Sequence, residues 1–366
     1  MKPQLTKEIA YKALQNFFTH KPFVLFGTGT SCAVDKNFGM GALEAYLKDE
    51  IPKVIQDDTQ ISEWGKVLEA LKDHGDFEAS MNSIQDETLL FQVINKTADL
   101  VSRVDRKNAY LILNGTIKWP AIGLLQRLVE RLPETDRTLH VATPNYDLMA
   151  EYAFVKANIP YTTGFWGGVL RKLDWTQAER QMTRPEKMVS GRTKVAYITR
   201  VIKHLRLYKV HGSLNTFVHD HQAVETDMWS VVPKGVERLM ITPGTSKHEK
   251  LLGCRDILLK DYDRAVSAHS AFLFLGFGFN DKQLVDNAIG EKLSSQCSPA
   301  LIITRDSNPR IEALLKVSPK TWLVCKHPDN DNSSTVIKNS QYMNDLILSD
   351  SRLWQFDHFT SEILGG

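Results

Sequence analysis

The fold of this chain is decided by the stretch from Lys21 to Ser31, which reads KPFVLFGTGTS. Its β-prone apolar run, Phe23 to Phe26, ends in two glycines with small hydroxyl residues around them. Residues 41–47, behind this turn, carry apolar side chains at helical spacing. A strand, a tight glycine turn and a helix present backbone N–H groups to a phosphate, and glycine lets the main chain approach a ligand closely. Because the turn lacks the full dinucleotide-binding or P-loop spacing, a β-turn without a ligand stays open.

Composition and charge describe an ordinary globular protein. Of the 366 residues, 42% are hydrophobic and 24% are charged, as in typical soluble domains. The 45 Lys and Arg residues nearly balance the 43 Asp and Glu residues, so the net charge of +2 gives no global case for nucleic-acid or membrane binding. The N-terminus has no apolar signal region, and no apolar run reaches about 18 residues, which predicts a cytoplasmic protein without a membrane span.

Strand-like and helix-like segments alternate along most of the chain. Residues 271–275 and 300–304 are continuous apolar runs, which are typical of central parallel strands buried on both faces. The alternation predicts an α/β fold with a parallel sheet. Further strand-like segments lie at 139–142, 205–210 and 239–242, and helical patterns lie at 4–19, 121–132, 257–268 and 311–315.

Two insertions interrupt this alternation. Residues 50–105 have helical periodicity and few glycines or prolines, so we expect an all-helical insertion. Residues 165–206 are glycine-rich and then basic, which indicates an insertion or cap. Its Lys and Arg residues form either a solvated face or a contact for a phosphate or an acidic partner. We therefore expect one domain over residues 1–330, with residues 331–366 as a C-terminal extension packed on it.

Four polar or glycine-rich motifs follow strand-like segments. In a doubly wound sheet, ligands bind outside the carboxyl ends of the strands, so these motifs are candidates for one shared site. Each alone also has a structural interpretation, because an asparagine can cap a helix, a histidine can be a satisfied core group and glycines can turn the chain. The motifs are Gly27–Ser31, Thr143–Asp147, His211–Ser213 and Gly276–Asp281.

In order and approximate spacing over residues 20–310, these motifs resemble those of the sirtuins, and most of all a divergent prokaryotic sirtuin-like branch. The resemblance implies a Rossmann-like parallel sheet that binds NAD, with the first turn on the diphosphate, the Thr143 segment under the nicotinamide ribose and the last turn on the adenosine half. His211 and Gly212 match the histidine–glycine pair of the family. The implied NAD-binding residues are Gly27, Thr28, Gly29, Ser31, Thr143, Asp147, Gly276, Gly278 and Asn280.

The chain also departs from the deacetylase sirtuins. It has no zinc-binding cysteine pairs after the histidine, and the acidic-Phe-Arg signature after the first turn is replaced by Ala42-Leu43-Glu44. The resemblance therefore implies NAD binding and cleavage of the nicotinamide bond rather than an acyl-lysine groove. The branch includes NAD-hydrolysing effectors of bacterial anti-phage defence (abortive infection). The resemblance also implies a homo-oligomer and a partner such as a DNA-translocase-type ATPase or another nucleic-acid-associated protein.

The residue types suit this chemistry. Nicotinamide leaves through an oxocarbenium-like ribose, and Asn145 can hold a water or a ribose hydroxyl without competing as a nucleophile. His211 can accept a proton near neutral pH, so Asn145 and His211 are the expected catalytic pair. Asp147 either orients the nicotinamide amide, stabilises positive charge at the ribose, or caps the helix that begins near Leu148. NAD-dependent deacylation, ADP-ribosyl transfer to protein and non-enzymatic sensing of NAD or ADP-ribose stay open as alternatives.

A metal site is not indicated by this sequence. The cysteines at 32, 254, 297 and 325 are scattered, so they indicate neither a disulfide framework nor a structural zinc site. His219 and His221 flank Asp220, and a polar hairpin loop explains them better than a metal does, since no other ligand cluster accompanies them.

We therefore predict that the purified protein carries no stoichiometric zinc. A structural tetrathiolate would require distant thiols to converge, and no cysteine spacing supports that arrangement. Elemental analysis after purification without added metal should find far less than one zinc per chain, and a chelator should leave the melting temperature unchanged. One tightly bound zinc per chain would contradict the prediction.

Overall fold

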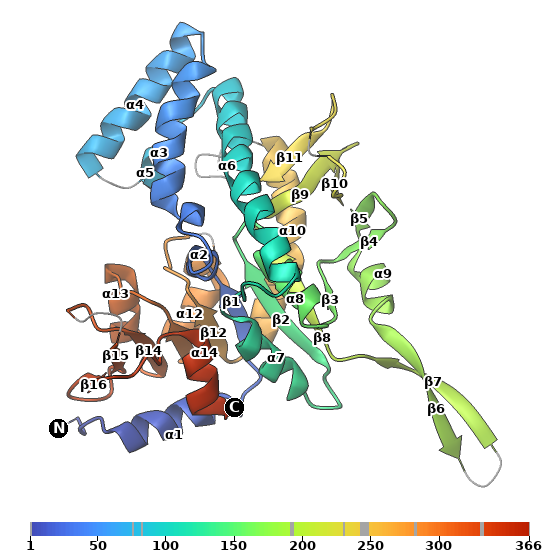
Figure 1. Cartoon of the computed structure of the whole chain (residues 1–366), viewed down its shortest axis with the longest axis vertical. Helices are drawn as coiled ribbons and strands as arrows, with labels where there is room; N and C mark the ends of the chain where they lie inside the picture. The colour runs from blue at the N-terminus through green and yellow to red at the C-terminus, as the bar shows by residue number, and fades with distance from the viewer. Residues whose placement is uncertain are drawn as a thin grey trace.

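The computed structural model describes residues 2–74, 77–81, 83–190, 194–229, 231–241, 249–281, 284–329 and 333–365. Within these ranges, the main sheet has nine strands in the order β16-β15-β14-β13-β12-β1-β2-β8-β3 (Figure 1). The central strands are β1 (Phe23–Phe26), β2 (Thr138–Thr143), β8 (His204–Lys209) and β12 (Phe272–Leu275). The flanking strands are β3 (Tyr161–Thr162), β13 (Ala300–Ile303), β14 (Thr321–Lys326), β15 (Thr335–Lys338) and β16 (Leu346–Leu348).

The topology of the main sheet confirms the predicted α/β fold. The strands from β3 to β14 across the sheet are parallel, and β15 and β16 add an antiparallel edge. Numbered along the chain, β8-β2-β1-β12-β13-β14 has the order 3-2-1-4-5-6, which is the Rossmann order. The order reverses between β1 and β12, so the crevice outside the carboxyl ends of these two strands is where such a sheet binds a dinucleotide.

Helices cover both faces of the sheet because the strands bury alternate side chains on opposite sides (Figure 1). Val24 and Phe26 of β1 face one core, and Phe23 and Leu25 face the other. The first core is closed by α1 (Lys7–Phe17), α7 (Ile122–Glu130), α8 (Met149–Lys156), α14 (Phe356–Phe359) and the π-helix η5 (Thr360–Leu364). The second is closed by α10 (Glu249–Ala268), the π-helix η4 (Val285–Ile289), α12 (Gly290–Ser294) and α13 (Pro309–Val317).

The region expected to be helical, residues 50–105, is confirmed as helical where the structure describes it. It holds η2 (Ile51–Lys53), α4 (Asp58–His74), α5 (Phe77–Met81) and most of α6 (Glu87–Leu113), and α3 (Met40–Glu50) packs with them (Figure 1). These helices enclose a separate core around buried residues such as Trp64, Val67 and Val93. The helix that follows the first glycine turn directly is a short one, α2 (Thr28–Cys32), and η1 (Lys36–Phe38) separates it from α3.

The basic insertion contributes to two smaller sheets. A five-stranded sheet has the order β11-β9-β10-β5-β4, and β6 pairs with β7 in a two-stranded ribbon that stands out from the body (Figure 1). The strand expected at 239–242 therefore belongs to the smaller sheet, because β11 pairs antiparallel with β9. These elements are β4 (Phe165–Gly167), β5 (Arg171–Leu173), α9 (Trp175–Arg180), β6 (Thr183–Ser190), β7 (Lys194–Val201), β9 (Gly212–His219), β10 (Gln222–Glu225) and β11 (Glu237–Met240).

The β9–β10 hairpin and the C-terminal strands bear on two further predictions from the sequence. Asp220 and His221 form the two-residue turn of the β9–β10 hairpin, with φ of 49° and 59°, which confirms the hairpin interpretation of the histidines around Asp220. The C-terminal segment joins the main sheet through β15 and β16, while the domain boundary near residue 330 stays a prediction. None of the described helices is both long and apolar enough to cross a bilayer.

The glycines of the first and last motifs pack against each other at the point where the strand order reverses. Gly29 N donates to Gly276 O at 3.0 Å, and Gly276 has a φ of +55°. A Cβ on Gly276 would lie 2.9 Å from both Gly29 C and Thr30 N, which is closer than side chains come to backbone. The two turns can therefore meet only as glycines.

We predict that Gly276→Ala lowers the free energy of unfolding by on the order of 2 kcal/mol, because it combines a left-handed backbone with a steric clash. The measurement is urea denaturation. Gly65→Ala is the matched control, since a Cβ on Gly65 of α4 meets nothing within 4 Å and an alanine in a helix should stabilise by about 0.5–1 kcal/mol. Equal midpoints for the two variants would contradict the prediction.

Candidate active site

The four motifs predicted from the sequence meet at one edge of the main sheet. They follow β1, β2, β8 and β12, which are neighbours in the order β12-β1-β2-β8 and run parallel. Thr143 of β2 pairs with Lys209 of β8, so Asn145 and His211 each lie two residues beyond a paired position. Register alone therefore brings the two expected catalytic residues to adjacent strand ends.

Asn145 connects the end of β2 to the glycine turn after β1. Its Nδ2 donates to Gly27 O at 3.1 Å and to Ser31 Oγ at 3.0 Å, while its own backbone N donates to Thr143 Oγ1 at 3.1 Å. The residue is only 6% exposed. Gly27 and Ser31, both predicted to bind NAD, thus orient the side-chain amide of Asn145, and Thr143 holds its backbone.

Asp147 extends this network into the protein. Its carboxylate hydrogen-bonds Ser31 and accepts from Met149 N at 3.2 Å, so its role at the start of α8 is present in the structure. Burial raises the pKa of Asp147, while the Lys209 ammonium and the hydrogen bond from Ser31 act in the opposite direction. Since these contacts are internal, Asp147 acts in this structure as a support for the turn and the helix.

His211 bridges the edge of the sheet from the other side. Its Nε2 is hydrogen-bonded to Oδ2 of Asp281. His211 follows β8 and Asp281 follows β12, and β1 and β2 lie between these two strands in the sheet. Asp281 Oδ1 also accepts from Leu284 N at 3.2 Å, so the carboxylate is held in place. Gly212, the next residue, has a φ of +70°, and a Cβ there would lie 1.8 Å from Leu239 O. Glycine is therefore required for the chain to turn from β8 into β9 behind the histidine.

Two polar atoms at this edge are buried without a hydrogen-bond partner among the described residues. They are Asn145 Oδ1 and His211 Nδ1. A buried polar atom without a partner costs about 1–3 kcal/mol, so such atoms are uncommon in folded proteins and call for a physical reason. Both belong to residues selected from the sequence as catalytic.

Asp281 is the residue of this site that the sequence interpretation missed. It stands next to Asn280, which was expected to contact the nucleotide, but Asn280 is exposed and its backbone O accepts from Arg310 Nη1 at 2.5 Å. Asn308 Nδ2 donates to Gly278 O at 2.9 Å, so residues after β13 hold the Gly276–Asp281 loop. An acidic residue at the end of a predicted central strand is the signal that could have identified Asp281.

The remaining predicted NAD-binding residues lie around the same edge. Thr28 is half-buried and Gly29 is exposed, whereas Gly278 is partly exposed next to Asn280. The first turn and the last turn therefore form the rim, and Asn145 and His211 form the floor. No group of three or more His, Cys, Asp or Glu side chains suited to a metal occurs among the residues that the structure describes.

A second polar cluster connects the floor of the site to the helical region. The Lys209 ammonium is buried, donates to Asp147 O at 2.6 Å and pairs with Glu151 Oε1 at 2.9 Å. Asp105 of α6 accepts from Leu148 N at 2.8 Å and from the Tyr152 hydroxyl at 2.7 Å. The start of α8 is thereby fixed both to β8 and to the C-terminal half of the long helix α6.

Comparison with known proteins finds one family model that matches part of the chain. Residues 139–316 match the family model of the SIR2-like domain, a segment that includes Asn145, His211 and Asp281 but not the first glycine turn. This match supports a sirtuin-like family and an NAD-related function. A search of curated proteins finds no match.

Two solved structures are similar to the chain over most of their length. One, described as "Structural Basis for the Mechanism and Regulation of Sir2 Enzymes", has 11% identity and a TM-score of 0.35 and covers 84% of this chain and 89% of its own. The other, "The Structural basis of Sirtuin Substrate Affinity", has 13% identity and a TM-score of 0.36. Its match covers 86% of this chain and 98% of the other chain.

The polar cluster generates a prediction about pH. Burial raises the pKa of Asp105 from 3.8 to about 6, so the folded protein binds this proton more tightly than the unfolded chain does. The stability that Asp105 contributes is therefore full below about pH 4 and is lost as the pH rises through 6.

The Asp105→Asn variant lacks this titrating group. The amide oxygen of the new asparagine can still accept a hydrogen bond from Leu148 N. The free energy of unfolding of the variant, relative to the wild type, should rise between about pH 4 and 7 by on the order of 2 to 3 kcal/mol. Urea denaturation at several pH values measures the difference, and the carboxyl groups that do not interact with Asp105 cancel between the two proteins. A difference that does not change with pH would show that Asp105 titrates normally.

Proposed function

We propose that the protein binds NAD across the β1–β12 crevice and hydrolyses its nicotinamide–ribose bond to give nicotinamide and ADP-ribose. The observation that carries the proposal is the pair of buried atoms without partners, Asn145 Oδ1 and His211 Nδ1, side by side in register at the carboxyl edge of a Rossmann-ordered sheet. The match of residues 139–316 to the SIR2-like domain supports the same substrate.

His211 is suited to accept a proton in this reaction. When its Nε2–H donates to the Asp281 carboxylate, the lone pair lies on Nδ1, the atom that has no partner among the described residues. Asp281 then fixes the tautomer and stabilises the imidazolium that forms, as the acidic member of a catalytic triad does. Asp281 is a positioning residue in this scheme.

The bond changes balance with water as the only second reactant. The ribose C1′–N bond breaks and its electron pair passes to the nicotinamide nitrogen, which becomes neutral. The oxygen of water forms the new bond to C1′, and its proton passes to Nδ1 of His211 and then to solvent. Asn145 Oδ1 is placed to hold that water or a ribose hydroxyl, because its Nδ2 is already engaged by Gly27 O and Ser31 Oγ.

We extend the proposal to a biological role as an NAD-depleting effector of bacterial anti-phage defence in the cytoplasm. The support is the resemblance of the ordered motifs to that sirtuin-like branch. In this role the enzyme is activated by self-assembly or by a partner such as a DNA-translocase-type ATPase. An NAD hydrolase without such control would harm its own cell, which is the reason to expect a gate.

The products of the reaction separate this proposal from its alternatives. Chromatography of the nucleotides after incubation with NAD should find nicotinamide and ADP-ribose in equal amounts. An acyl-ADP-ribose product would instead indicate deacylation, labelled protein would indicate ADP-ribosyl transfer, and binding without turnover would indicate a sensor.

We predict that His211→Ala lowers turnover of NAD on the order of a hundredfold or more, since a positioned proton acceptor contributes that much. Asn145→Ala should also abolish turnover, and Asp281→Asn should lower kcat and change its pH dependence more than it changes KM. The assay is nicotinamide release under conditions in which the wild type turns over.

The matched control is His219→Ala, because His219 lies on the β9–β10 hairpin with 38% of its side chain exposed. Melting temperatures separate a chemical effect from unfolding. A folded His211→Ala protein with the wild-type rate would reject His211 as the proton acceptor. If the Asn145→Ala and His211→Ala proteins both unfold, the two residues have a structural role instead of a catalytic one.

A further inference from the structure

The segments that follow β2 and β8 stay attached to each other beyond the main sheet. Val210 N donates to Thr143 O at 3.2 Å, directly after the last paired residues of the two strands. Farther along both segments, Leu214 N donates to Tyr146 O at 2.9 Å. The two expected catalytic residues lie between these backbone hydrogen bonds, one on each segment.

The side chain of Tyr146 adds a connection through a third segment. Its hydroxyl donates to Ile241 O at 2.7 Å, and Ile241 N donates to His211 O at 2.9 Å. Ile241 follows β11, the strand that pairs with β9 just after the histidine. Because Tyr146 follows Asn145 directly in the chain, the Tyr146–Ile241 bridge connects the backbone beside Asn145 to the backbone of His211.

The Tyr146–Ile241 bridge supports the turn that carries His211. Between the two backbone hydrogen bonds the chain turns at Gly212, which has a φ of +70°. Glycine has more backbone freedom than other residues, so a turn built on it needs outside contacts to keep one shape. Ile241 holds this turn at His211 O, and the Tyr146 hydroxyl holds Ile241 in place.

The separation of the catalytic pair matters for the proposed reaction. The Asp281 carboxylate orients the imidazole of His211, and the first glycine turn orients the amide of Asn145. A water held by Asn145 Oδ1 must also lie within reach of His211 Nδ1 to give up its proton. A misplacement of about 1 Å can cost on the order of a hundredfold in rate, so contacts that set this separation affect turnover.

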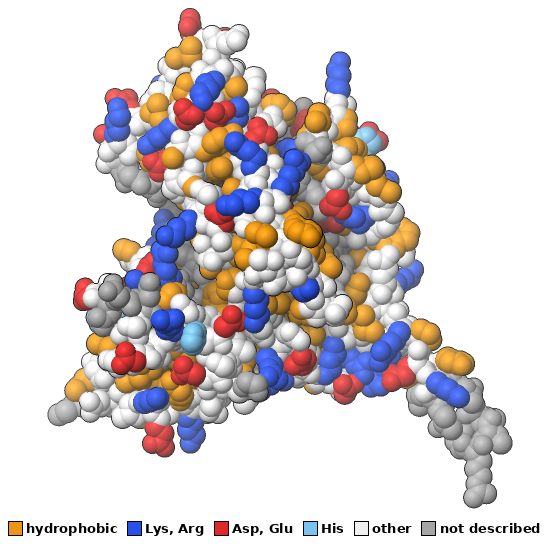
Figure 2. All heavy atoms as spheres, in the orientation of Figure 1, with side chains coloured by type: hydrophobic (Ala, Val, Ile, Leu, Met, Phe, Trp, Pro, Cys, Tyr) orange, Lys and Arg blue, Asp and Glu red, His pale blue; other side chains and the backbone are white. Residues whose placement is uncertain are grey.

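The ring of Tyr146 is held independently of its hydroxyl. The helical region presents charged side chains of both signs to solvent, as Figure 2 shows, and buries its apolar side chains in a separate core. Tyr146 and Leu214 pack against that core, and Met240, the residue before Ile241, is fully buried in it. A phenylalanine in place of Tyr146 would therefore keep the packing and lose the hydrogen bond to Ile241 O.

We propose that Tyr146 is a positioning residue for the NAD hydrolysis proposed above, a role that rests on that hydrolysis. Its hydroxyl, acting through Ile241, keeps the turn of His211 at the separation from Asn145 that proton transfer from the water requires. Tyr146 itself takes no proton and contacts neither the water nor the nucleotide in this role.

The test is Tyr146→Phe, which removes the hydroxyl and keeps the ring. Its kcat for nicotinamide release should fall roughly tenfold, because the pair is no longer held at one separation. Its KM should stay within about twofold of the wild type, since an interaction that matters only in the transition state lowers kcat and leaves KM unchanged. Turnover is expressed per ADP-ribose-binding site, counted by calorimetric titration, so that unfolded protein does not enter the rate.

The matched control is Tyr110→Phe, which removes the same atom from a residue of α6 that is 71% exposed. Its kcat, KM and melting temperature should equal those of the wild type. A Tyr146 that only stabilises the fold would give a lower melting temperature in Tyr146→Phe with an unchanged kcat per binding site, and this result would overturn the proposal. A higher KM with an unchanged kcat would also overturn it, because Tyr146 would then act in NAD binding.

The failure of this role can be told apart from the failure of the proposed hydrolysis. A wild type that releases nicotinamide no faster than the Tyr146→Phe protein, at a measurable rate, would reject the role of Tyr146 alone. A wild type that releases no nicotinamide would reject the hydrolysis and the positioning role with it.

Discussion

The close backbone contact between two glycine turns is the constraint on which the rest of the structure depends. Gly29 and Gly276 meet at the point where the strand order reverses, and their hydrogen bond joins the two halves of the main sheet. Because no side chain stands between them, the turns after β1 and β12 form one continuous rim. The segments after β2 and β8 can then close beneath that rim, which is how residues far apart in sequence come to share one site.

Polar contacts rather than apolar packing hold the floor of this site. Asn145, which follows β2, is oriented by the glycine turn after β1. His211, which follows β8, is oriented by Asp281 in the loop after β12. The Asp105 contacts extend the same network to α6. A movement of the helical region would thus reach the segment that carries Asn145 and Asp147, which gives the proposed control by assembly a physical route.

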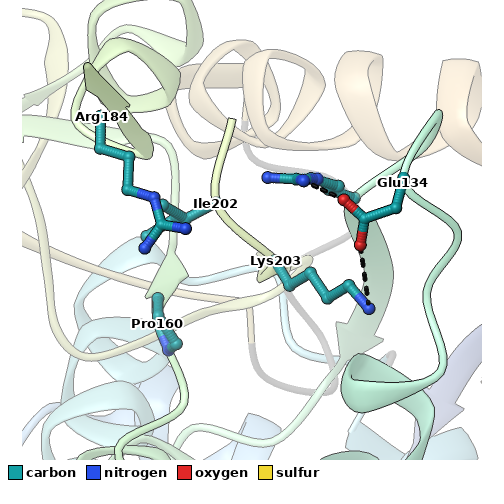
Figure 3. Close-up of a pocket in the computed structure, with 6 residues that line it drawn as sticks. Glu134, Pro160, Arg184, Ile202 and Lys203 are labelled. Atoms are coloured by element: carbon teal, nitrogen blue, oxygen red, sulfur yellow. Dashed lines mark hydrogen bonds and ion pairs between the residues drawn. The ribbon is translucent and has the colours of Figure 1, made fainter. Parts of the chain in front are cut away.

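The two edges of the sheet have different chemistry. At the carboxyl edge, buried neutral and acidic groups surround a histidine and an amide, an arrangement suited to bond cleavage. At the amino edge, Arg137 and Lys203 line a hollow and pair with Glu134 (Figure 3).

The sequence by itself determined the α/β class, the helical region and the four motifs of the candidate site, since apolar runs, helical spacing and glycine turns are local patterns. The tertiary structure alone decided three matters that depend on contacts between distant segments. It paired Asp281 with His211, assigned residues 237–240 to the smaller sheet, and neutralised Arg171 through Glu225 and Asp227. Strand register and ion pairing arise only when the chain is folded, so no local pattern could reveal them.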